Sequence, residues 1–336
     1  MSKELTKTGA VEPRGPSAAG PALVSVIVPA YDCAAFIGET LDSVLAQTYT
    51  DFEVIVVNDG SPDTAELERA LVPYLARCDH RVRYFRQENR GAGAARNRGI
   101  LEAQGEFVAF LDGDDLWLPT YLEKQLQLLE EGGLDLVYTD ALLFGDSPLA
   151  GKTYMQTSPS EGPVNFVSLV RNDCNVITSG VVARRAAILD AGLFDETLRN
   201  AQDFELWARL AHRGARMGYQ RKVLVRYRCR EGSLSGDAEN RLAREWRVTR
   251  HIADTYRLTE RERAEVERML SRQRAAIDFE RGRSLLREGE FDAAREALVR
   301  ARRVFNGWKL TTALLMLRVA PRLLQRLAGR RLYTRP

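Results

Sequence analysis

The chain has 336 residues, and 45% of them are hydrophobic, so it can bury a sizeable core in one large or two ordinary domains. Its formal net charge is +3, yet residues 300–336 hold ten Lys or Arg and no Asp or Glu, which leaves −7 on the remainder. This distribution excludes a broad basic surface for nucleic acid and confines the cationic excess to the C-terminal tail.

The cysteines and the chain ends give no sign of a zinc site or of export. The four cysteines lie at wide intervals without CxxC or Cys/His spacing, which favours a reducing, cytoplasmic setting. Residues 1–22 are rich in Gly, Pro, Ser and Ala and lack an apolar run, so we expect a disordered leader rather than a signal peptide. The longest apolar stretch, 310–319, is shorter than the about 20 residues that span a bilayer.

Short β-branched runs alternate with helix-length segments from residue 23 to 115, as in repeated βα units of a parallel sheet. Ligands of such sheets bind beyond the carboxyl ends of the strands. Polar clusters follow three of the predicted strands, so we expect one binding crevice there. The predicted strands cover residues 23–29, 52–59, 82–85 and 107–112, and the clusters are 29–32, 58–61 and 112–115.

The pattern changes in the second half of the chain. A helix at about 119–131 and a strand at 135–144 are followed by a polar stretch, a helix beginning near Ala201 and a strand at 222–228. From about Gly236 the sequence is almost wholly helical in character. Residues 279–305 have the pattern of one tetratricopeptide-like hairpin, and one copy is too few for a solenoid. We therefore expect this hairpin to pack against the catalytic body.

Two common phosphate-binding loops are excluded. Residues 91–96, GAGAAR, begin like a dinucleotide fingerprint, but arginine replaces the third glycine. The acids at the end of the next strand belong to the DGDD segment and do not match the ribose-binding acid of that fingerprint. A GxxxxGK[ST] loop is also missing from the sequence.

Carboxylates follow two of the predicted parallel strands and can converge on one crevice. They are Asp59 and the acids of the DGDD segment, Asp112 to Asp115. Mg²⁺ and Mn²⁺ prefer oxygen ligands, and they often take one or two carboxylates together with water and substrate phosphate. Such an ion would offset the repulsion among these acids and bind a diphosphate. Alternatively, Asp115 and one neighbour could cap the helix that follows.

Five motifs occur in one order over about residues 24–234: VIVPAYD, VVNDGS, ENRGAGAARNRG, FLDGDD and QDFELWARL. This order resembles the family 2 glycosyltransferases. The resemblance implies the α/β GT-A fold, a Rossmann-like, mostly parallel sheet flanked by helices and followed by a helical C-terminal region. We expect a GT-A domain at 23–235, a helical region with the hairpin at 236–307, and a cationic amphipathic tail at 308–336.

The resemblance also implies an activity. It is inverting, metal-dependent transfer of a hexosyl group from a nucleotide-diphosphate donor, most commonly a UDP-sugar, with Mg²⁺ or Mn²⁺. The acceptor would be a hydroxyl of a glycan or lipid-linked saccharide in cell-surface polysaccharide or glycoconjugate synthesis. Two other hypotheses are a nucleotide-binding adaptor without turnover and a sugar nucleotidyltransferase. The latter class normally has a Gly-rich, basic first loop, which VIVPAYDCAAF is not.

Individual roles follow from the resemblance. Asp114 would be the protein ligand of the metal, Asp203 the catalytic base, and Asp112 a contact to ribose or donor sugar. Gln202 stands where the family often has Glu, and Asn58 where it has Asp, but the neighbouring Asp203 and Asp59 are intact. The remaining nucleotide- or donor-binding residues would be Pro29, Ala30, Tyr31, Asp32, Asp59, Arg96, Arg226, Arg228 and Arg230.

Each of these roles has a simpler alternative. An inverting transfer needs a carboxylate on the acceptor side to remove the hydroxyl proton. Asp203 in the first turn of its helix would suit this role, or its charge could only interact with the helix dipole. Arg226, Arg228 and Arg230 would share one strand face and suit phosphate, or they could belong to a solvated edge strand. The three histidines, His80, His212 and His251, receive no role.

The tail suggests a separate partner. Leucines recur at near-helical spacing, arginines are four residues apart, and Pro321 should kink the helix. Such a helix could lie on an anionic leaflet at the inner face of the cytoplasmic membrane, or dock its leucines on the catalytic domain. The leucines are Leu310, Leu314, Leu317, Leu324 and Leu327, and the arginines are Arg318, Arg322, Arg326 and Arg330.

Overall fold

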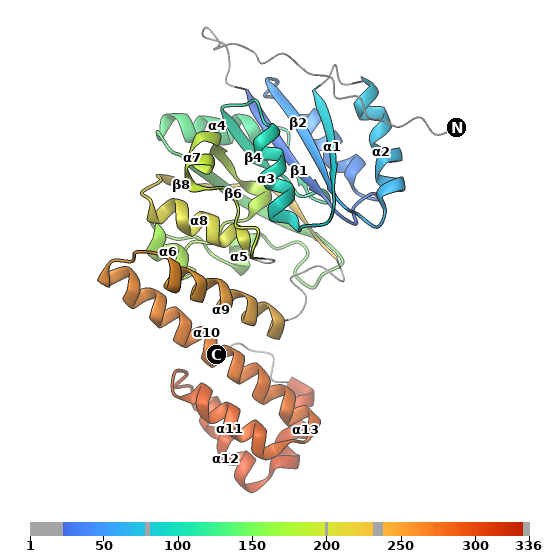
Figure 1. The fold of residues 1–336 in the computed structure, drawn as a ribbon. Helices are drawn as coiled ribbons and strands as arrows, with labels where there is room; N and C mark the ends of the chain where they lie inside the picture. Colours follow the sequence, from blue (N-terminus) through green and yellow to red (C-terminus); the bar gives the residue numbers. More distant parts are fainter. Residues whose placement is uncertain (1–22, 78–80, 199–200, 231–237, 332–336) are drawn as a thin grey trace.

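The computed structural model describes residues 23–77, 81–198, 201–230 and 238–331 (Figure 1). The leader expected at 1–22 lies outside the described residues, as do Cys78 and His80. Among the described helices none is both long enough and apolar enough to cross a membrane.

An eight-stranded mixed sheet forms the centre of the N-terminal part, in the order β3-β2-β1-β4-β7-β6-β8-β5. Strands β1 to β4 pair in parallel, as the βα alternation predicts. Antiparallel β7 joins β4 to β6, and β6 pairs with β8 in parallel. The strands are β1 Val24–Ala30, β2 Phe52–Asp59, β3 Val82–Gln87, β4 Phe107–Phe110, β5 Leu116–Trp117, β6 Leu136–Gly145, β7 Val182–Arg184 and β8 Met217–Cys229.

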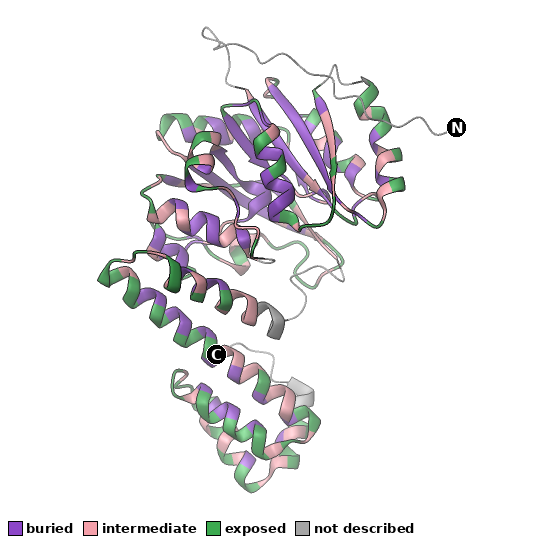
Figure 2. Ribbon diagram, in the orientation of Figure 1, coloured by how far each residue is buried: buried purple, intermediate pink, exposed green. Residues whose placement is uncertain are grey.

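Helices cover both faces of this sheet, and the alternation of side chains along each strand divides the core in two. Val26, Val54 and Val56 face the apolar sides of α1, α2 and α4. Ile27 and Ile55 face α3, α7 and α8 on the other side. Figure 2 shows the resulting buried sheet between exposed outer helix faces. The helices are α1 Ile37–Leu45, α2 Thr64–Arg77, α3 Ala92–Glu102, α4 Tyr121–Glu131, α5 Tyr154–Thr157, α6 Phe166–Val170, α7 Arg185–Ala191 and α8 Gln202–His212.

The C-terminal helices extend away from the sheet (Figure 1). Helices α9 and α10 bury Val248, Ile252 and Val266 against α6 and α8. The far half of α10 forms a second core with α11, α12 and α13. The hairpin of residues 279–305 therefore shares its core with the tail helices and not with the catalytic body, contrary to our expectation. The helices are α9 Ala238–Thr255, α10 Glu260–Glu288, α11 Phe291–Arg302, α12 Trp308–Val319 and α13 Pro321–Arg331.

Candidate active site

The loops after β1 and β2 are joined by hydrogen bonds. The backbone N–H of Asp32 donates to Ser61 Oγ (2.7 Å), and Asp32 has a positive φ of 50°. Asn58 is fully buried and donates to Thr64 Oγ1 (3.0 Å) and Tyr84 Oη (2.9 Å). A neutral amide makes these bonds without burying a charge.

Of the predicted nucleoside-binding residues, the structure exposes some and buries others. Tyr31 is 51% exposed at the end of β1, whereas Ala30 beneath it is fully buried. Asp59 is also buried and accepts hydrogen bonds from Gln87 Nε2 (2.8 Å) and from the backbone N–H groups of Arg90 (3.0 Å) and Gly91 (2.7 Å). Asp59 therefore holds the Gly-rich loop at the start of α3 in place beside the end of β2.

The DGDD turn lies directly beyond β4 and packs closely against β1. A Cβ at Gly113 would lie 2.7 Å from Cys33 Sγ and 3.3 Å from the Pro29 carbonyl oxygen, so only glycine fits. Asp112 Oδ1 accepts from Arg96 Nη2 (2.5 Å). Burial, followed by the charge of Asp112, raises the pKa of Asp114 above its usual range.

Asp115 has a structural role in this turn. It is buried, and it accepts from Ser179 Oγ (2.6 Å) and from the backbone N–H of Arg228 (2.8 Å). Burial and the charges of the two neighbouring carboxylates raise its pKa well above the usual range. The helix-capping alternative is wrong, because α4 begins after Thr120 and has no side-chain cap.

The three arginines at the end of β8 stack on two phenyl rings. Arg226 and Arg228 lie 4.4 and 4.6 Å from the ring centre of Phe144, and Arg228 also lies 4.5 Å from that of Phe36. Arg230 Nε is 3.1 Å from Asp114 Oδ2, and its Nη1 donates to the Asp32 carbonyl oxygen (2.9 Å). The cation that the Asp114 carboxylate faces is thus the guanidinium of Arg230.

Arg228 is bound more firmly than the other two. Its Nε donates to the Asp114 carbonyl oxygen (2.8 Å), and its Nη2 pairs with Glu39 (2.8 Å). Arg228 therefore ties the DGDD turn to α1.

Asp203 lies in the first turn of α8, as the sequence predicts, with Leu206, Trp207 and Leu210 buried. Its Oδ2 accepts from Thr178 Oγ1 (2.8 Å), and its Oδ1 accepts from the backbone N–H of Phe204 (2.8 Å). Each carboxylate oxygen retains a further lone pair for a substrate proton.

A short 3-10 helix, η1 Thr178–Gly180, joins Asp203 to the DGDD turn. Thr178 binds Asp203, while its neighbour Ser179 binds Asp115 and accepts from the Asp112 backbone N–H (3.2 Å). Arg96 lies between the same two acidic groups. Burial lowers its pKa, but the carboxylates of Asp112 and Asp203 outweigh burial, so the pKa is raised. The sequence analysis did not identify Thr178 and Ser179 as residues of the site. The only feature that could have indicated them is the run of small and hydroxyl residues ITSG.

Gln202 connects α8 to the Gly-rich start of α3. A Cβ at Gly93 would lie 2.7 Å from Gln202 Oε1, and the Gln202 amide donates to the Leu198 carbonyl oxygen. Asn97 holds the loop before α8 through the Phe194 carbonyl oxygen (2.9 Å) and Glu196 Oε1 (3.0 Å). The residue next to Asp203 is thus packed directly on the nucleotide-side helix.

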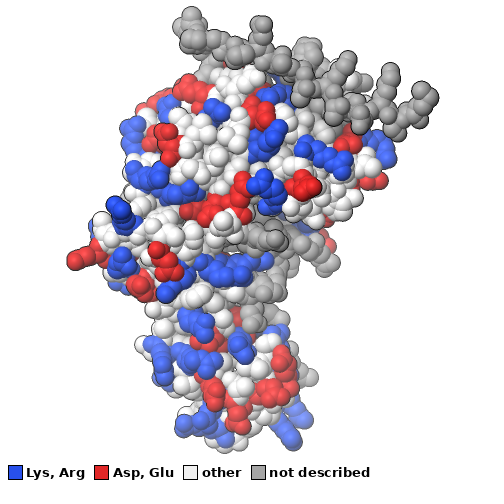
Figure 3. Space-filling model, in the orientation of Figure 1, with Lys and Arg blue, Asp and Glu red and all other residues white. Residues whose placement is uncertain are grey.

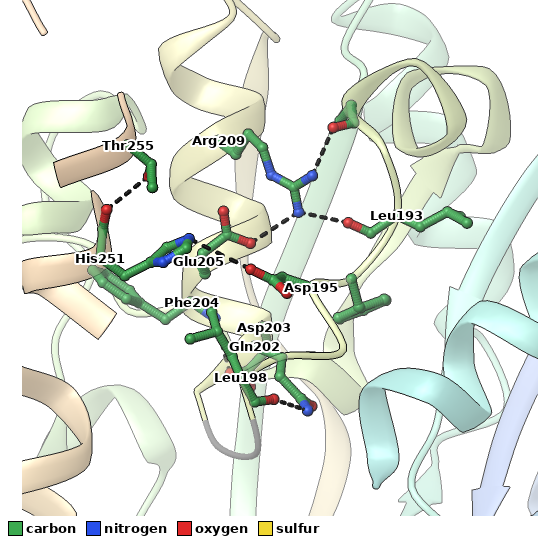
Figure 4. Close-up of polar contacts among 12 residues, drawn as sticks. Leu193, Asp195, Leu198, Gln202, Asp203, Phe204, Glu205, Arg209, His251 and Thr255 are labelled. Atoms are coloured by element: carbon green, nitrogen blue, oxygen red, sulfur yellow. Dashed lines mark hydrogen bonds and ion pairs between the residues drawn. The ribbon is translucent and has the colours of Figure 1, made fainter. Parts of the chain in front are cut away.

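Behind α8, a second polar cluster joins α9 to the same loop (Figure 4). His251 Nε2 is 3.4 Å from Asp195 Oδ2, and Arg209 pairs with Glu205 (2.8 Å). Tyr256 Oη donates to Glu205 Oε1 (2.6 Å). These groups line a cavity of about 690 Å³. His251, to which the sequence assigned nothing, therefore braces the loop that leads to Asp203.

The acidic turn fits a divalent cation of the Mg²⁺ or Mn²⁺ type. In the part of the chain that the structure describes, no three His, Cys, Asp or Glu side chains are placed to enclose a metal. These ions need only one or two carboxylates when a substrate diphosphate supplies further ligands. Asp112 and Asp114 meet that requirement, while both oxygens of Asp115 are already engaged.

Comparisons with known sequences agree with this arrangement. The profile described as Glycosyl transferase family 2 matches residues 25–189. An uncharacterized glycosyltransferase of Rickettsia typhi is 31% identical over 230 residues, which cover 66% of this chain and 68% of that protein. The UDP-Glc:alpha-D-GlcNAc-diphosphoundecaprenol beta-1,3-glucosyltransferase WfaP of Escherichia coli is 28% identical, and the match covers 68% of this chain and 86% of that protein. The chain spans about a third of the longer relatives. One of them, an uncharacterized glycosyltransferase of Rickettsia conorii, is 33% identical, and the match covers 61% of this chain and 34% of that protein.

Solved structures share the fold. The Staphylococcus aureus TarS 1-349 complex with UDP-GlcNAc has a TM-score of 0.60 at 21% identity, covering 91% of this chain and 90% of that one. The mannosyltransferase PcManGT of Pyrobaculum calidifontis, in complex with GDP-Man and Mn²⁺, has a TM-score of 0.60 at 18% identity, with 91% and 84% covered. The chain has the GT-A fold and belongs to glycosyl transferase family 2.

Proposed function

We propose that this protein is an inverting glycosyltransferase that moves a hexosyl group from a nucleoside-diphosphate donor to a hydroxyl of a glycan or lipid-linked saccharide. The observation that carries the proposal is the junction of Asp203 with the DGDD turn through Arg96 and η1. This junction supports the proposal because it links the candidate base to the candidate diphosphate site near the carboxyl ends of β1, β2 and β4.

The nucleoside would bind where the loops after β1 and β2 meet. The ring of Tyr31 is exposed and can stack on a base, while Pro29 and Ala30 support the loop beneath it. Asp59 keeps lone-pair capacity for a base N–H beside the bonds it already accepts, and Asp32 would line the nucleoside pocket. A UDP-sugar is the expected donor, since the Escherichia coli relative is named for UDP-Glc and TarS binds UDP-GlcNAc.

The donor diphosphate would lie over the DGDD turn. Asp114, aided by Asp112, would hold a Mg²⁺ or Mn²⁺ ion, which would supply charge stabilisation for the leaving diphosphate. Arg230 would leave Asp114 and turn its guanidinium to the phosphate oxygens. Arg226 and Arg228 would contribute positive charge from the same strand face, while the hydrogen bond from Arg96 would hold the Asp112 side chain beside the sugar.

Asp203 would act on the acceptor hydroxyl. As the hydroxyl oxygen bonds to the anomeric carbon, its proton passes to a free lone pair of the Asp203 carboxylate. The bond from the anomeric carbon to the diphosphate oxygen breaks on the opposite face, and the electron pair leaves with the nucleoside diphosphate. Thr178 and the N–H of Phe204 keep the carboxylate oriented during this step.

The acceptor proposal follows the names of the relatives. The Escherichia coli enzyme acts on a diphosphoundecaprenol-linked sugar, and a Bacillus subtilis relative is a putative teichuronic acid biosynthesis glycosyltransferase. A lipid-linked acceptor would place this protein in the cytoplasm at the inner face of the membrane. Its product would then enter cell-surface polysaccharide or glycoconjugate synthesis.

A panel of UDP- and GDP-sugars with Mn²⁺ or Mg²⁺ tests the proposal by release of the nucleoside diphosphate. We expect one donor to be turned over by the wild type, and Asp203→Asn to bind UDP normally while losing about 10²- to 10⁴-fold in rate. Asp190→Asn, at an exposed position on α7, is the matched control and should keep full activity.

Three outcomes would contradict the proposal. Failure to bind or hydrolyse any nucleotide sugar with either metal would remove the enzymatic function. Binding of UDP without turnover would favour the adaptor hypothesis. Release of pyrophosphate from a nucleoside triphosphate and a sugar 1-phosphate would favour a nucleotidyltransferase.

A further inference from the structure

The two tail helices divide their apolar side chains between a core and an exposed surface. Leu310, Leu317 and Leu324 are at most 7% exposed and pack with Leu298 of α11 and Leu286 of α10. Three of the five leucines that we expected on the membrane-facing side of the tail are therefore buried inside the protein. The exposed set shares only Leu327 with those five leucines: Trp308 (73%), Leu315 (63%), Val319 (81%), Leu323 (52%) and Leu327 (49%).

These exposed residues form one row on each of the two tail helices. Leu315 and Val319 follow Trp308 by seven and eleven positions, which brings each of them within about 20° of Trp308 around α12. Leu323 and Leu327 are four positions apart on α13, the helix that begins at Pro321. We call these five residues the tail surface. Its side chains all point away from the core that α10 to α13 share.

Positive charge surrounds the tail surface. Arg318, Arg322 and Arg326 are exposed, and no ion pair joins them to an acid in the described part of the chain. After Glu296 the sequence contains ten Lys or Arg and no acid. Figure 3 shows basic side chains at the end of this lobe, together with acidic ones. An apolar surface with cations beside it is complementary to a surface that has both hydrocarbon and negative charge.

We propose that the tail surface docks on an anionic phospholipid bilayer. Tryptophan and leucine side chains enter the boundary between headgroups and acyl chains, and arginines bind the phosphate groups. A second copy of this chain is the less suitable occupant, because it would bring the same arginines against these ones. Insertion of the apolar side chains and attraction of the arginines to lipid phosphates act together, and stable but reversible attachment to a membrane requires two such contributions.

The connection to the catalytic domain makes this docking useful. Helix α10 has 29 residues and is therefore about 43 Å long. Near its start, Glu265 accepts two hydrogen bonds from Arg171 at the end of α6 (2.9 and 2.6 Å). Docking at the far end would hold the active site at a fixed distance from the lipid, within reach of a saccharide on a lipid carrier. The docking itself does not depend on the proposed transfer reaction.

Sedimentation of the full chain with vesicles tests the proposal without any donor sugar. We expect co-sedimentation with phosphatidylglycerol-containing vesicles and little with phosphatidylcholine alone. The variant Arg318→Gln/Arg322→Gln/Arg326→Gln should lose about a hundredfold in partitioning, because each basic residue at such a surface contributes about a fivefold factor. Its control, Arg69→Gln/Arg263→Gln/Arg272→Gln, removes three exposed arginines elsewhere and should bind as the wild type does.

The apolar part is tested separately. Trp308→Ser/Leu315→Ser/Val319→Ser should also lose binding, whereas Val72→Ser/Leu101→Ser, at exposed sites on α2 and α3, should not. All variants must keep the wild-type thermal midpoint. Brominated lipid should quench tryptophan emission of the wild type and not that of Trp308→Phe, because Trp117 and Trp207 are buried and Trp246 packs against the core that α9 and α10 share with α6 and α8.

Two results would overturn the proposal. One is equal vesicle binding by the wild type and the tail variants. The other is a concentration-dependent dimer that the apolar variant abolishes, which would assign the tail surface to a second copy.

Discussion

Gly93→Ala tests how the Gly-rich helix and the catalytic helix are joined. The new Cβ would lie 2.7 Å from Oε1, 2.8 Å from Cδ and 3.1 Å from Nε2 of Gln202, where ordinary contact begins at 3.4 Å. Gln202 is buried and bound to the Leu198 carbonyl oxygen, so its side chain cannot simply turn away. Overpacking of this kind costs about 1–3 kcal/mol. Part of the displacement must pass to Asp203, the next residue.

We therefore expect Gly93→Ala to lower the free energy of unfolding by about 1–3 kcal/mol and to lower kcat more than UDP affinity. The measurements are urea unfolding and donor turnover. Gln202→Ala removes the obstructing atoms, so the double variant Gly93→Ala/Gln202→Ala should recover most of the loss, with a coupling of about 0.5–3 kcal/mol. Additive effects of the two substitutions, or a neutral Gly93→Ala, would refute this reasoning.

Three further predictions concern ion pairs. Arg209→Met should lower the free energy of unfolding by about 3–5 kcal/mol, because it leaves the buried Glu205 carboxylate without its ion-pair partner. Its control is Arg98→Met, in an exposed ion pair of the same i,i+4 spacing, which should lower the free energy of unfolding by about 0.5 kcal/mol or less. Urea unfolding measures both. Hydrogen bonds from Arg171 depress the pKa of Glu265 to about 2. The stability that this pair contributes is thus full above pH about 4.5 and is lost as the pH falls through about 2, and Arg171→Gln should flatten that acid limb in thermal unfolding. Arg230→Ala should raise Mn²⁺ affinity without nucleotide and lower turnover; unchanged affinity in calorimetry would show that Arg230 does not compete with the metal.

The sequence predicted the parallel half of the sheet because its strands are buried on both faces and appear as continuous β-branched runs. It also placed the polar clusters correctly at the strand ends, since chain order and parallel pairing suffice for that inference. Strands β5 and β7 were not distinguishable, because two or three residues carry no periodicity.

Contacts between distant segments could not be predicted. Ser179 meets Asp115 from 64 residues away, and the Arg228 backbone meets it from 113 residues away. Which side of the tail is buried depends on the position of α11, and the leucine spacing alone does not contain that information. The domain boundaries and the roles of the site residues remain predictions that these experiments address.

The central claim is that acids from separate strands and from α8 meet around one donor diphosphate. Anomalous diffraction at the manganese edge, from crystals grown with UDP and Mn²⁺, tests it most directly. We expect one peak beside Asp114, a diphosphate between that peak and the β8 arginines, and the Asp203 carboxylate open to the same cavity. A manganese peak far from Asp114, or UDP bound away from the ends of β1 and β2, would contradict the claim.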